Sequence, residues 1–368
     1  MQLKNIELKN FRNYSDFNYV FKSDKTLIIG KNAQGKTNLL EGIYYLSSLN
    51  SKRIGRDSEL IKFGEDFAVL KGNVQKEGFD IDLEVLINPP KKKVLKVNGL
   101  KKNKSKEFLR VLGVVYFCVD DLLLLRGEPS DRRHWLDCAI CQIYPAYDEK
   151  LSKYNKIRLQ KSNFLSQFDG NYDMLDVFNS QLAISGANVI YLRKKFLGEL
   201  EKIAREKHIE IAHDENLSLQ YDSVILENVV DYSPKEITEI FLNKLNEMKQ
   251  DEIRREQCLI GPHRDDISYF INGIDSKKFA SQGQQRTIVL ALKLAELEII
   301  KEKNNDLPLL LLDDVLAELD NIRQNFLLQA VRDKVQTIIT SVDTLAFDEK
   351  FLSEVEILKI QNGELVNE

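Results

Sequence analysis

Apolar positions change their spacing twice along the chain. Up to about residue 120 they form short runs that predict β-strands, at 3–8, 26–29, 68–74, 81–87, 94–97 and 114–117. From about residue 132 to 248 they recur every three or four positions, which predicts helices at 136–144, 151–168, 175–203 and 237–248. A strand-like run at 217–225 interrupts these helices, and beyond residue 258 strand and helix patterns alternate again. The helical block therefore reads as an insertion in a mixed chain.

The last part of the chain contains two runs typical of strands that are buried on both faces. Leucines fill 309–312, and Thr337-Ile338-Ile339-Thr340 follows after a predicted helix. Such strands occur in parallel sheets covered by helices, so the expected fold class is α/β. We expect an α/β lobe at 1–125 and 255–368 and a mainly helical arm at 126–254. No heptad pattern is long enough for an extended coiled coil.

The turn after the run at 26–29 has the residues of a phosphate-binding loop. It reads Gly30-Lys31-Asn32-Ala33-Gln34-Gly35-Lys36-Thr37 and fits G-x-x-x-x-G-K-[ST], between a predicted strand and an apolar-faced helix at 39–46. In this pattern backbone N–H groups cradle the phosphates, the lysine reaches the β and γ oxygens, and the hydroxyl holds Mg²⁺. We therefore expect the whole loop to bind nucleotide, with Lys36 on the phosphates and Thr37 on the metal.

A pair of carboxylates follows the leucine run. Asp313 and Asp314 stand at the predicted carboxyl end of that strand, where α/β sheets bind ligands. We expect Asp313 to hold Mg²⁺ opposite Thr37, directly or through water. Asp314 is expected to act in catalysis, by orienting or deprotonating the attacking water. The simpler alternative is a buried strand that ends in a solvated turn.

A further candidate segment precedes a strong helix pattern at 287–297. It reads Ser281-Gln282-Gly283-Gln284-Gln285-Arg286. Serine is a preferred N-cap residue, glycine permits close approach of another backbone, and the first turn of a helix offers unpaired N–H groups to an anion. Ser281, Gln282 and Gly283 are therefore candidates for contact with a nucleotide phosphate, and Ser281, like Lys36, is expected to act in catalysis.

Charge is spread unevenly. The net charge is −4 and the pI about 5.8, so the whole chain does not point to a polyanionic partner. One segment nevertheless collects eight lysines, namely Lys91, Lys92, Lys93, Lys96, Lys101, Lys102, Lys104 and Lys106. Within it, Asn98-Gly99 is a strong signal for a tight hairpin turn. The hairpin is either a contact for a phosphate backbone or an edge strand protected by lysines.

Other features exclude several classes. No apolar run is long enough to cross a membrane, and the first residues lack the apolar core of a signal peptide, so we expect a cytoplasmic protein without a membrane partner. The four cysteines are too few for a disulfide framework, and Cys138-x-x-Cys141 has no second ligand pair nearby, which favours buried thiols over a metal or redox site. His134 and His263 likewise lack the neighbours of a metal site, so structural hydrogen bonding is the favoured role.

The order of these motifs resembles one group of ATPases. The phosphate-binding loop, S-x-G-Q-x-R before a helix, L-L-L-D-D and then Glu318-Leu319-Asp320 follow one another as in the ABC-type heads of the structural-maintenance-of-chromosomes and RecF group. Within that group the local sequences are similar to the RecF family of DNA repair proteins. The segments that carry this likeness are N-F-R-N-Y at 10–14, the loop at 30–37, D-R-R-H-W-L-D at 131–137, G-P-H-R-D-D at 261–266 and the serine motif at 281–286.

The resemblance implies an ABC-type ATPase head in which two protomers sandwich two ATP molecules. The serine motif would contact the γ-phosphate bound by the other protomer, and Arg12 would reach the phosphates, although a surface arginine is the alternative. ATP and Mg²⁺ are the implied cofactors, and ATP hydrolysis is expected to be weak and DNA-dependent. The implied partners are a second copy of the chain, single- and double-stranded DNA at gaps or junctions, and recombination mediator proteins. The implied roles are gap repair, replication-fork maintenance and loading of recombinase.

Some positions depart from the family pattern, and other classes stay open. The segment at 117–121 lacks the usual residues, so no Q-loop residue can be assigned. Thr340 and Ser341 stand where transporter ATPases use histidine, and hydroxyls alone suggest slow hydrolysis. A transporter-type ATPase subunit would need that histidine and a Q-loop glutamine. A P-loop kinase of metabolites would work as a monomer without the serine motif.

Overall fold

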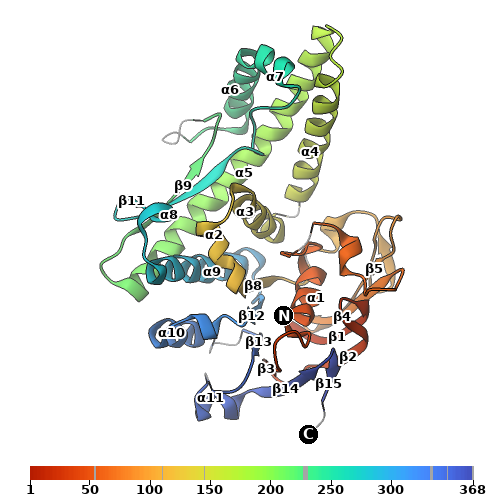
Figure 1. Cartoon of the computed structure of the whole chain (residues 1–368), viewed down its shortest axis with the longest axis vertical. Coiled ribbons are helices and arrows are strands. Elements are labelled where there is room, and N and C mark those ends of the chain that lie inside the picture. The colour runs from red at the N-terminus through yellow and green to blue at the C-terminus, as the bar shows by residue number, and fades with distance from the viewer. Residues whose placement is uncertain are drawn as a thin grey trace. The chain divides into compact units, whose positions relative to one another are not determined.

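The computed structural model describes residues 1–53, 55–109, 111–144, 146–226, 231–331, 335–345 and 347–366 (Figure 1). The chain divides into two compact units, and the second boundary falls within helix α9 (Gln282–Asn304). Unit 1 comprises Met1–Asp121 and Lys293–Glu368, and unit 2 comprises Leu122–Leu292. The chain thus leaves unit 1 once and returns to it once.

A six-stranded sheet in the order β15-β14-β3-β13-β12-β8 forms the centre of unit 1. Its strands are β3 (Lys25–Ile29), β8 (Val114–Cys118), β12 (Leu309–Asp313), β13 (Thr337–Ser341), β14 (Glu356–Gln361) and β15 (Glu364–Leu365). All neighbours pair in parallel except β14 and β15, which form an antiparallel hairpin. The carboxyl ends of β3, β12 and β13 therefore lie at one edge of the sheet, and loops at this edge bind ligands in α/β proteins.

A second, antiparallel sheet of unit 1 has the order β2-β1-β4-β5-β6-β7 (Figure 1). Its strands are β1 (Gln2–Phe11), β2 (Tyr14–Val20), β4 (Ala68–Lys76), β5 (Phe79–Ile87), β6 (Val94–Val97) and β7 (Leu100–Lys102). Alternate side chains of β1, including Leu3, Ile6 and Leu8, are fully buried with the apolar residues of α1 (Lys36–Ser48). The core of unit 1 thus fixes the helix that follows the phosphate-binding loop. The remaining helices of this unit are α10 (Asn321–Val331) and α11 (Glu349–Glu354).

The predicted lysine hairpin forms and lies at the edge of this second sheet. Asn98 and Gly99 both have positive φ, 50° and 73°, as the tight turn requires. Lys96 pairs with Glu84 at 2.7 Å and Lys102 lies 3.8 Å from Glu107, whereas Lys101 and Lys104 are exposed. Lysines on an outermost strand also discourage pairing with another chain, so the hairpin retains both of its interpretations.

Unit 2 is mainly helical, with a small antiparallel sheet in the order β11-β10-β9. Its helices are α2 (Leu123–Arg126), α3 (Pro129–Ile143), α4 (Ala146–Leu165), α5 (Tyr172–Ala212), α6 (Pro234–Glu247), α7 (Lys249–Arg255), α8 (Ser276–Phe279) and the start of α9, and its strands are β9 (Leu217–Asp222), β10 (Asp266–Ile271) and β11 (Ile274–Asp275). The 41-residue α5 packs against α4, α6 and β9. None of the described helices is both long and apolar enough to cross a membrane.

A buried polar network joins the two motif segments of unit 2. The guanidinium of Arg193, which is 2% exposed, binds both carboxylate oxygens of Asp137 at 2.8 Å and donates to the carbonyl of Pro262 at 2.6 Å. Arg132 forms a similar two-point bond with Asp266, at 2.6 and 3.0 Å. Such bidentate pairs are directional, so they fix the loop at 261–266 against α3. These motif residues therefore organise the core of unit 2.

Candidate nucleotide site

The loop Gly30–Thr37 joins β3 to α1 and has a backbone that only small residues allow. A Cβ at Gly30 would collide with the carbonyl oxygen of Ile360 on β14. Gly35 has a φ of +112° and Ala33 one of +64°. The positive φ values turn the chain sharply into α1, as a loop that wraps around an anion requires.

The start of α1 is open to an anion. Gly35 is its N-cap residue and offers no side-chain oxygen, and the first turn has no acidic residue. Lys36 is 4% exposed, and its Nζ donates to the carbonyls of Gly30 at 2.6 Å and Lys31 at 3.3 Å. These bonds hold the ammonium at the loop, next to N–H groups that a phosphate can satisfy.

The hydroxyl of Thr37 meets the carboxylate of Asp313 across the sheet edge. Thr37 Oγ1 donates to Asp313 Oδ1 at 3.0 Å, and Thr340 Oγ1 donates to the same oxygen at 2.8 Å. Asp313 Oδ2 accepts from the hydroxyl of Tyr116 at 2.7 Å. Burial raises the pKa of Tyr116 well above its ordinary value, and the charge of Asp313 adds to this, so the phenol remains a donor. Three hydroxyls thus orient one buried carboxylate.

Asp314 lies beside this carboxylate at the end of β12. It has a φ of +53°, and its backbone N–H donates to Thr340 Oγ1 at 2.9 Å. Burial raises the pKa of its carboxyl group; the charge of Asp313 acts in the same direction and that of Lys36 opposes it. A carboxylate with a raised pKa is a better proton acceptor, as a group that activates water must be.

The side chains and backbone groups at this edge of the sheet fit a nucleotide with bound Mg²⁺. Thr37 and Asp313 offer the hard oxygen ligands that Mg²⁺ prefers, and their atoms already lie within hydrogen-bond distance of each other. Lys36 and the open start of α1 provide the positive charge and N–H donors that phosphates need. The sequence therefore predicted groups that the fold brings together from β3, α1, β12 and β13.

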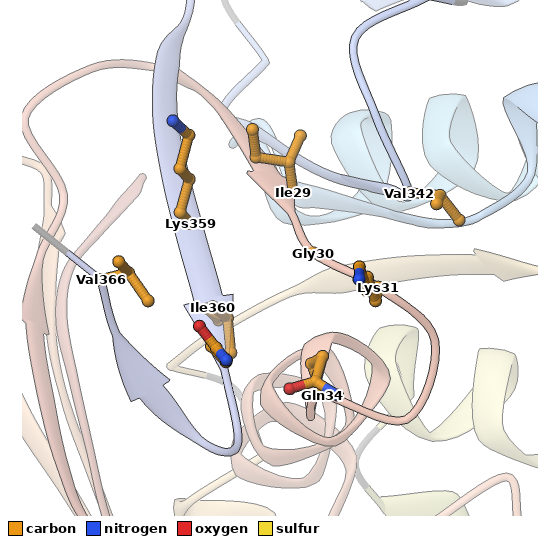
Figure 2. A pocket seen from close by; sticks show the side chains of 9 residues that line it. Ile29, Gly30, Lys31, Gln34, Val342, Lys359, Ile360 and Val366 are labelled. Atoms are coloured by element: carbon orange, nitrogen blue, oxygen red, sulfur yellow. The ribbon is translucent and has the colours of Figure 1, made fainter. Parts of the chain in front are cut away.

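A cavity of about 390 Å³ lies on the loop beside β14 (Figure 2). Its apolar wall is made by Ile29, Val342, Ile360 and Val366, and its polar lining by Gly30, Lys31, Gln34, Lys359 and Gln361. In Figure 2, Gln34 points from the loop toward the end of β14. The lining does not include Lys36, Thr37 or Asp313, so the cavity adjoins the metal side of the loop without containing it.

The turn between β14 and β15 binds the tip of the loop. Gly363 N donates to the carbonyl of Gln34 at 2.9 Å, and Asn362 N donates to its side-chain oxygen at 2.8 Å. Asn13 Nδ2 donates to the same carbonyl at 3.3 Å, and Asn13 Oδ1 accepts from Asn38 at 2.7 Å. The hairpin at the end of the chain is therefore part of the support of the phosphate-binding loop.

Arg12 is engaged by a helix of its own unit. Its guanidinium binds both carboxylate oxygens of Glu41 at 2.8 Å and the carbonyl of Glu59 at 3.1 Å. Glu41 is 1% exposed and lies on α1. The structure thus gives Arg12 a structural partner, and a contact with phosphate stays a prediction.

The serine motif belongs to unit 2. Ser281 is exposed and caps α9, because its Oγ accepts from Gln284 N at 3.2 Å while Gln284 Oε1 accepts from Ser281 N at 2.8 Å. Gln282 and Gly283 form the first turn of this helix. The N-cap expected for Ser281 is confirmed, and the role of the motif toward nucleotide stays a prediction.

Comparison with known proteins gives the family of this chain. The family model described as RecF/RecN/SMC N terminal domain matches residues 2–364. The DNA replication and repair protein RecF of Bacillus cereus (strain B4264) is 41% identical, over 99% of this chain and 98% of its own length. The chain belongs to the RecF family. It is accordingly an ABC-type ATP-binding protein of DNA replication, repair and recombination.

Solved structures agree with this assignment. The structure of the recombination mediator protein RecF with ATP, described within the RecFOR pathway, has a TM-score of 0.90 and 34% identity, and the match covers 99% of this chain and 96% of that one. The Smc head bound to the C-winged helix domain of ScpA has a TM-score of 0.55 and 15% identity, with 100% and 97% coverage. The second likeness supports the fold alone. The expected ABC-type head without a long coiled coil is confirmed.

Proposed function

We propose that this RecF-family chain is an ATP-dependent DNA-binding protein of recombinational gap repair and replication-fork maintenance, and that it assists loading of recombinase at single-strand gaps. ATP binding drives two copies together on DNA, and slow hydrolysis to ADP and phosphate releases them. The observation that carries this proposal is the hydrogen bond from Thr37 to Asp313, because it assembles both halves of a magnesium nucleotide site in a RecF-type head. Recombination mediator proteins and gapped or junction DNA are the proposed partners.

The chain's own residues divide the chemistry as follows. The loop Gly30–Thr37, with the ammonium of Lys36, binds the phosphates. Thr37 and Asp313 would hold Mg²⁺, which would neutralise charge on the phosphates. Asp314 positions and accepts a proton from water. The hydroxyl of Thr340 already donates to Asp313 and accepts from the N–H of Asp314. This strand therefore offers no strong base to the attacking water. Hydrolysis is therefore expected to be slow.

Dimerisation follows from the serine motif. The helix capped by Ser281 offers its first N–H groups and Gly283 to an anion, and in the proposed dimer this anion is the γ-phosphate bound by the other copy. The residues at 126–254 are proposed to form the arm domain of each copy. A monomeric kinase has no use for such a motif, and a transporter-type subunit does not fit membership in the RecF family.

The test measures molecular mass and DNA binding with and without ATP for three proteins. The unmodified chain should dimerise and bind a gapped duplex only with ATP. Lys36→Ala should lose ATP binding and both responses, because the phosphates lose their cation. Asp314→Asn should bind ATP but hydrolyse it at least about tenfold more slowly, and so accumulate as the ATP-bound dimer. Normal turnover in Asp314→Asn would remove Asp314 from catalysis, and a chain that stays monomeric with ATP would contradict the proposed function.

A further inference from the structure

Three arginines surround one loop of unit 2 that the nucleotide site does not use. His263 Nδ1 lies 2.6 Å from the hydroxyl of Tyr154 on α4, and its Nε2 lies 3.2 Å from the carbonyl of Cys258. Arg158 stands four residues after Tyr154 and therefore on the same face of α4. Arg264 follows His263 directly, and Arg133 on α3 donates to the carbonyl of Asp265 at 2.8 Å.

These guanidinium groups act on the same imidazole. The pKa of His263 is lowered from 6.5 to about 4, first by burial and then by the positive charges of Arg158, Arg264 and Arg133. The pKa of Arg133 is itself lowered, by burial and by the charge of Arg193, while the charges of Asp266, Asp137 and Asp265 oppose this shift. The positive charges of all three arginines therefore reach this imidazole, and they add to the effect of burial.

The acidic groups near the loop are committed elsewhere. The carboxylate of Asp265 accepts from Tyr221 at 2.6 Å and from Val224 N at 3.1 Å, and burial raises its pKa to about 6. Asp266 binds Arg132 and Lys277, and Asp137 binds Arg193. None of these carboxylates is directed at the three arginines by a hydrogen bond that the structure shows.

Two of the arginines are themselves available. Among the residues that the structure describes, neither the guanidinium of Arg158 nor that of Arg264 has a hydrogen-bond or ion-pair partner. Arg264 is exposed and Arg158 half-buried. In the lysine hairpin of unit 1, by comparison, Lys96 and Lys102 already have acidic partners, whereas Lys101 and Lys104 are exposed. A rigid fork of N–H donors without a partner matches the geometry of a phosphate oxygen pair.

We propose that Arg133, Arg158 and Arg264 form a binding site for the phosphodiester backbone of nucleic acid. The site rests on the proposed DNA binding of this chain and gives it a location in unit 2. The site is expected to bind phosphates without recognising bases. The cluster contains no amide side chain that could pair with a base, and its guanidinium groups interact with the charge of the backbone. A phosphate held there also lowers the repulsion among the three guanidinium groups.

The first test removes the two unpartnered charges in the full chain, in the presence of ATP. Arg158→Gln with Arg264→Gln should weaken binding of a short duplex at least about tenfold, since charge-assisted hydrogen bonds are lost. The dependence of log affinity on log salt should flatten by about 0.9 for each phosphate contact removed. Lys153→Gln with Lys156→Gln is the matched control, because it takes the same charge from exposed positions of α4. Arg158→Lys with Arg264→Lys should keep the salt dependence and lose part of the affinity.

The second test follows the His263 ring by NMR, which a purely structural role of the arginines would not move. Duplex DNA should raise the pKa of His263 from about 4, because a bound phosphate stabilises the imidazolium. Inorganic phosphate at the same phosphate concentration should not reproduce the shift. The proposal is overturned if Arg158→Gln with Arg264→Gln binds DNA as tightly as Lys153→Gln with Lys156→Gln does. It is also overturned if inorganic phosphate alone raises the pKa of His263. If the unmodified chain binds no DNA with ATP, the proposed function fails first and this assignment with it.

Discussion

At the scale of single residues, two neighbouring groups of the loop at 261–266 have opposite effects on stability at acidic pH. The pKa of His263 is lowered to about 4, by burial first and by three arginine charges next, so protonation favours the unfolded chain. Folding stability from this group is present above about pH 6.5 and is lost as the pH falls toward 4. The pKa of Asp265 is raised to about 6 by burial, so its protonation favours the folded chain as the pH falls from about 6 to 4.

Replacing the histidine should therefore reveal the effect of the aspartate. When the pH falls from 7 to 4, the free energy of unfolding of His263→Asn should rise by about 3 kcal/mol relative to that of the unmodified chain. The size follows because one pKa unit corresponds to about 1.4 kcal/mol. Denaturant unfolding followed by the fluorescence of Trp135, the single tryptophan and a buried residue of α3, measures this in unit 2. Parallel stability curves for the two proteins over this range would show that His263 is not held neutral.

The residue scale also separates what the sequence could predict about the site from what it could not. The roles proposed for Lys36 and Thr37 follow from the local pattern of a loop between strand and helix, and that of Asp313 follows from its place at the end of a leucine run. Tyr116 binds Asp313 at 2.7 Å from 197 residues away in sequence, and nothing in the local pattern of β8 marks it. Only the strand order places β8 next to β12. Contacts of this kind depend on register, which periodicity does not encode.

At the scale of elements, the hairpin of β14 and β15 supports the phosphate-binding loop, and the sequence did not predict this role. Strands 94–97 and 309–312 were predictable from apolar runs, whereas β14 alternates and stands alone near the end of the chain. The sequence did not predict β2, and for the small sheet of unit 2 it predicted only the strand-like run at 217–225. The polar faces of these strands dilute the apolar pattern. The importance of β14 arises from its turn, which binds Gln34.

Gly363→Ala tests this support of the loop. Gly363 has a φ of +80°, and a Cβ there would lie 3.0 Å from the carbonyl oxygen of Asn13. The added methyl should displace the turn from Gln34 and weaken ATP binding several-fold, beyond the roughly 1 to 2 kcal/mol of backbone strain in stability. Gly78→Ala is the control, with a φ of +85° and nothing within 4 Å. Calorimetric titration with ATP should separate the two variants, and equal affinities would mean that the hairpin does not position the loop.

At the scale of the whole molecule, the chain carries its two nucleotide-related motifs in different compact units. Residues 30–37 and 313–314 lie in unit 1, and Ser281 lies in unit 2 shortly before the chain returns to unit 1. The sequence predicted the insertion of a helical block and placed 255–368, with the whole of α9, in the α/β lobe. The boundary between the compact units lies inside α9, and a helix of 23 residues has the same pattern on both sides of it. In the proposed dimer, the serine motif in unit 2 of one copy would contact the nucleotide bound by the loop in unit 1 of the other.

Ser281→Arg tests the shared nucleotide. In the proposed dimer the arginine would collide with the nucleotide of the other copy, so the variant should bind ATP as a folded monomer and fail to dimerise. It also loses the N-cap of α9, which costs about 1 kcal/mol and must be separated from the collision. Ser233→Arg provides this control, because Ser233 caps α6 through the same reciprocal bonds with Glu236. Both variants should lose similar stability in thermal unfolding, whereas light scattering with ATP should show a dimer for Ser233→Arg alone. A persistent ATP-dependent dimer of Ser281→Arg would mean that the serine motif does not face the partner's nucleotide.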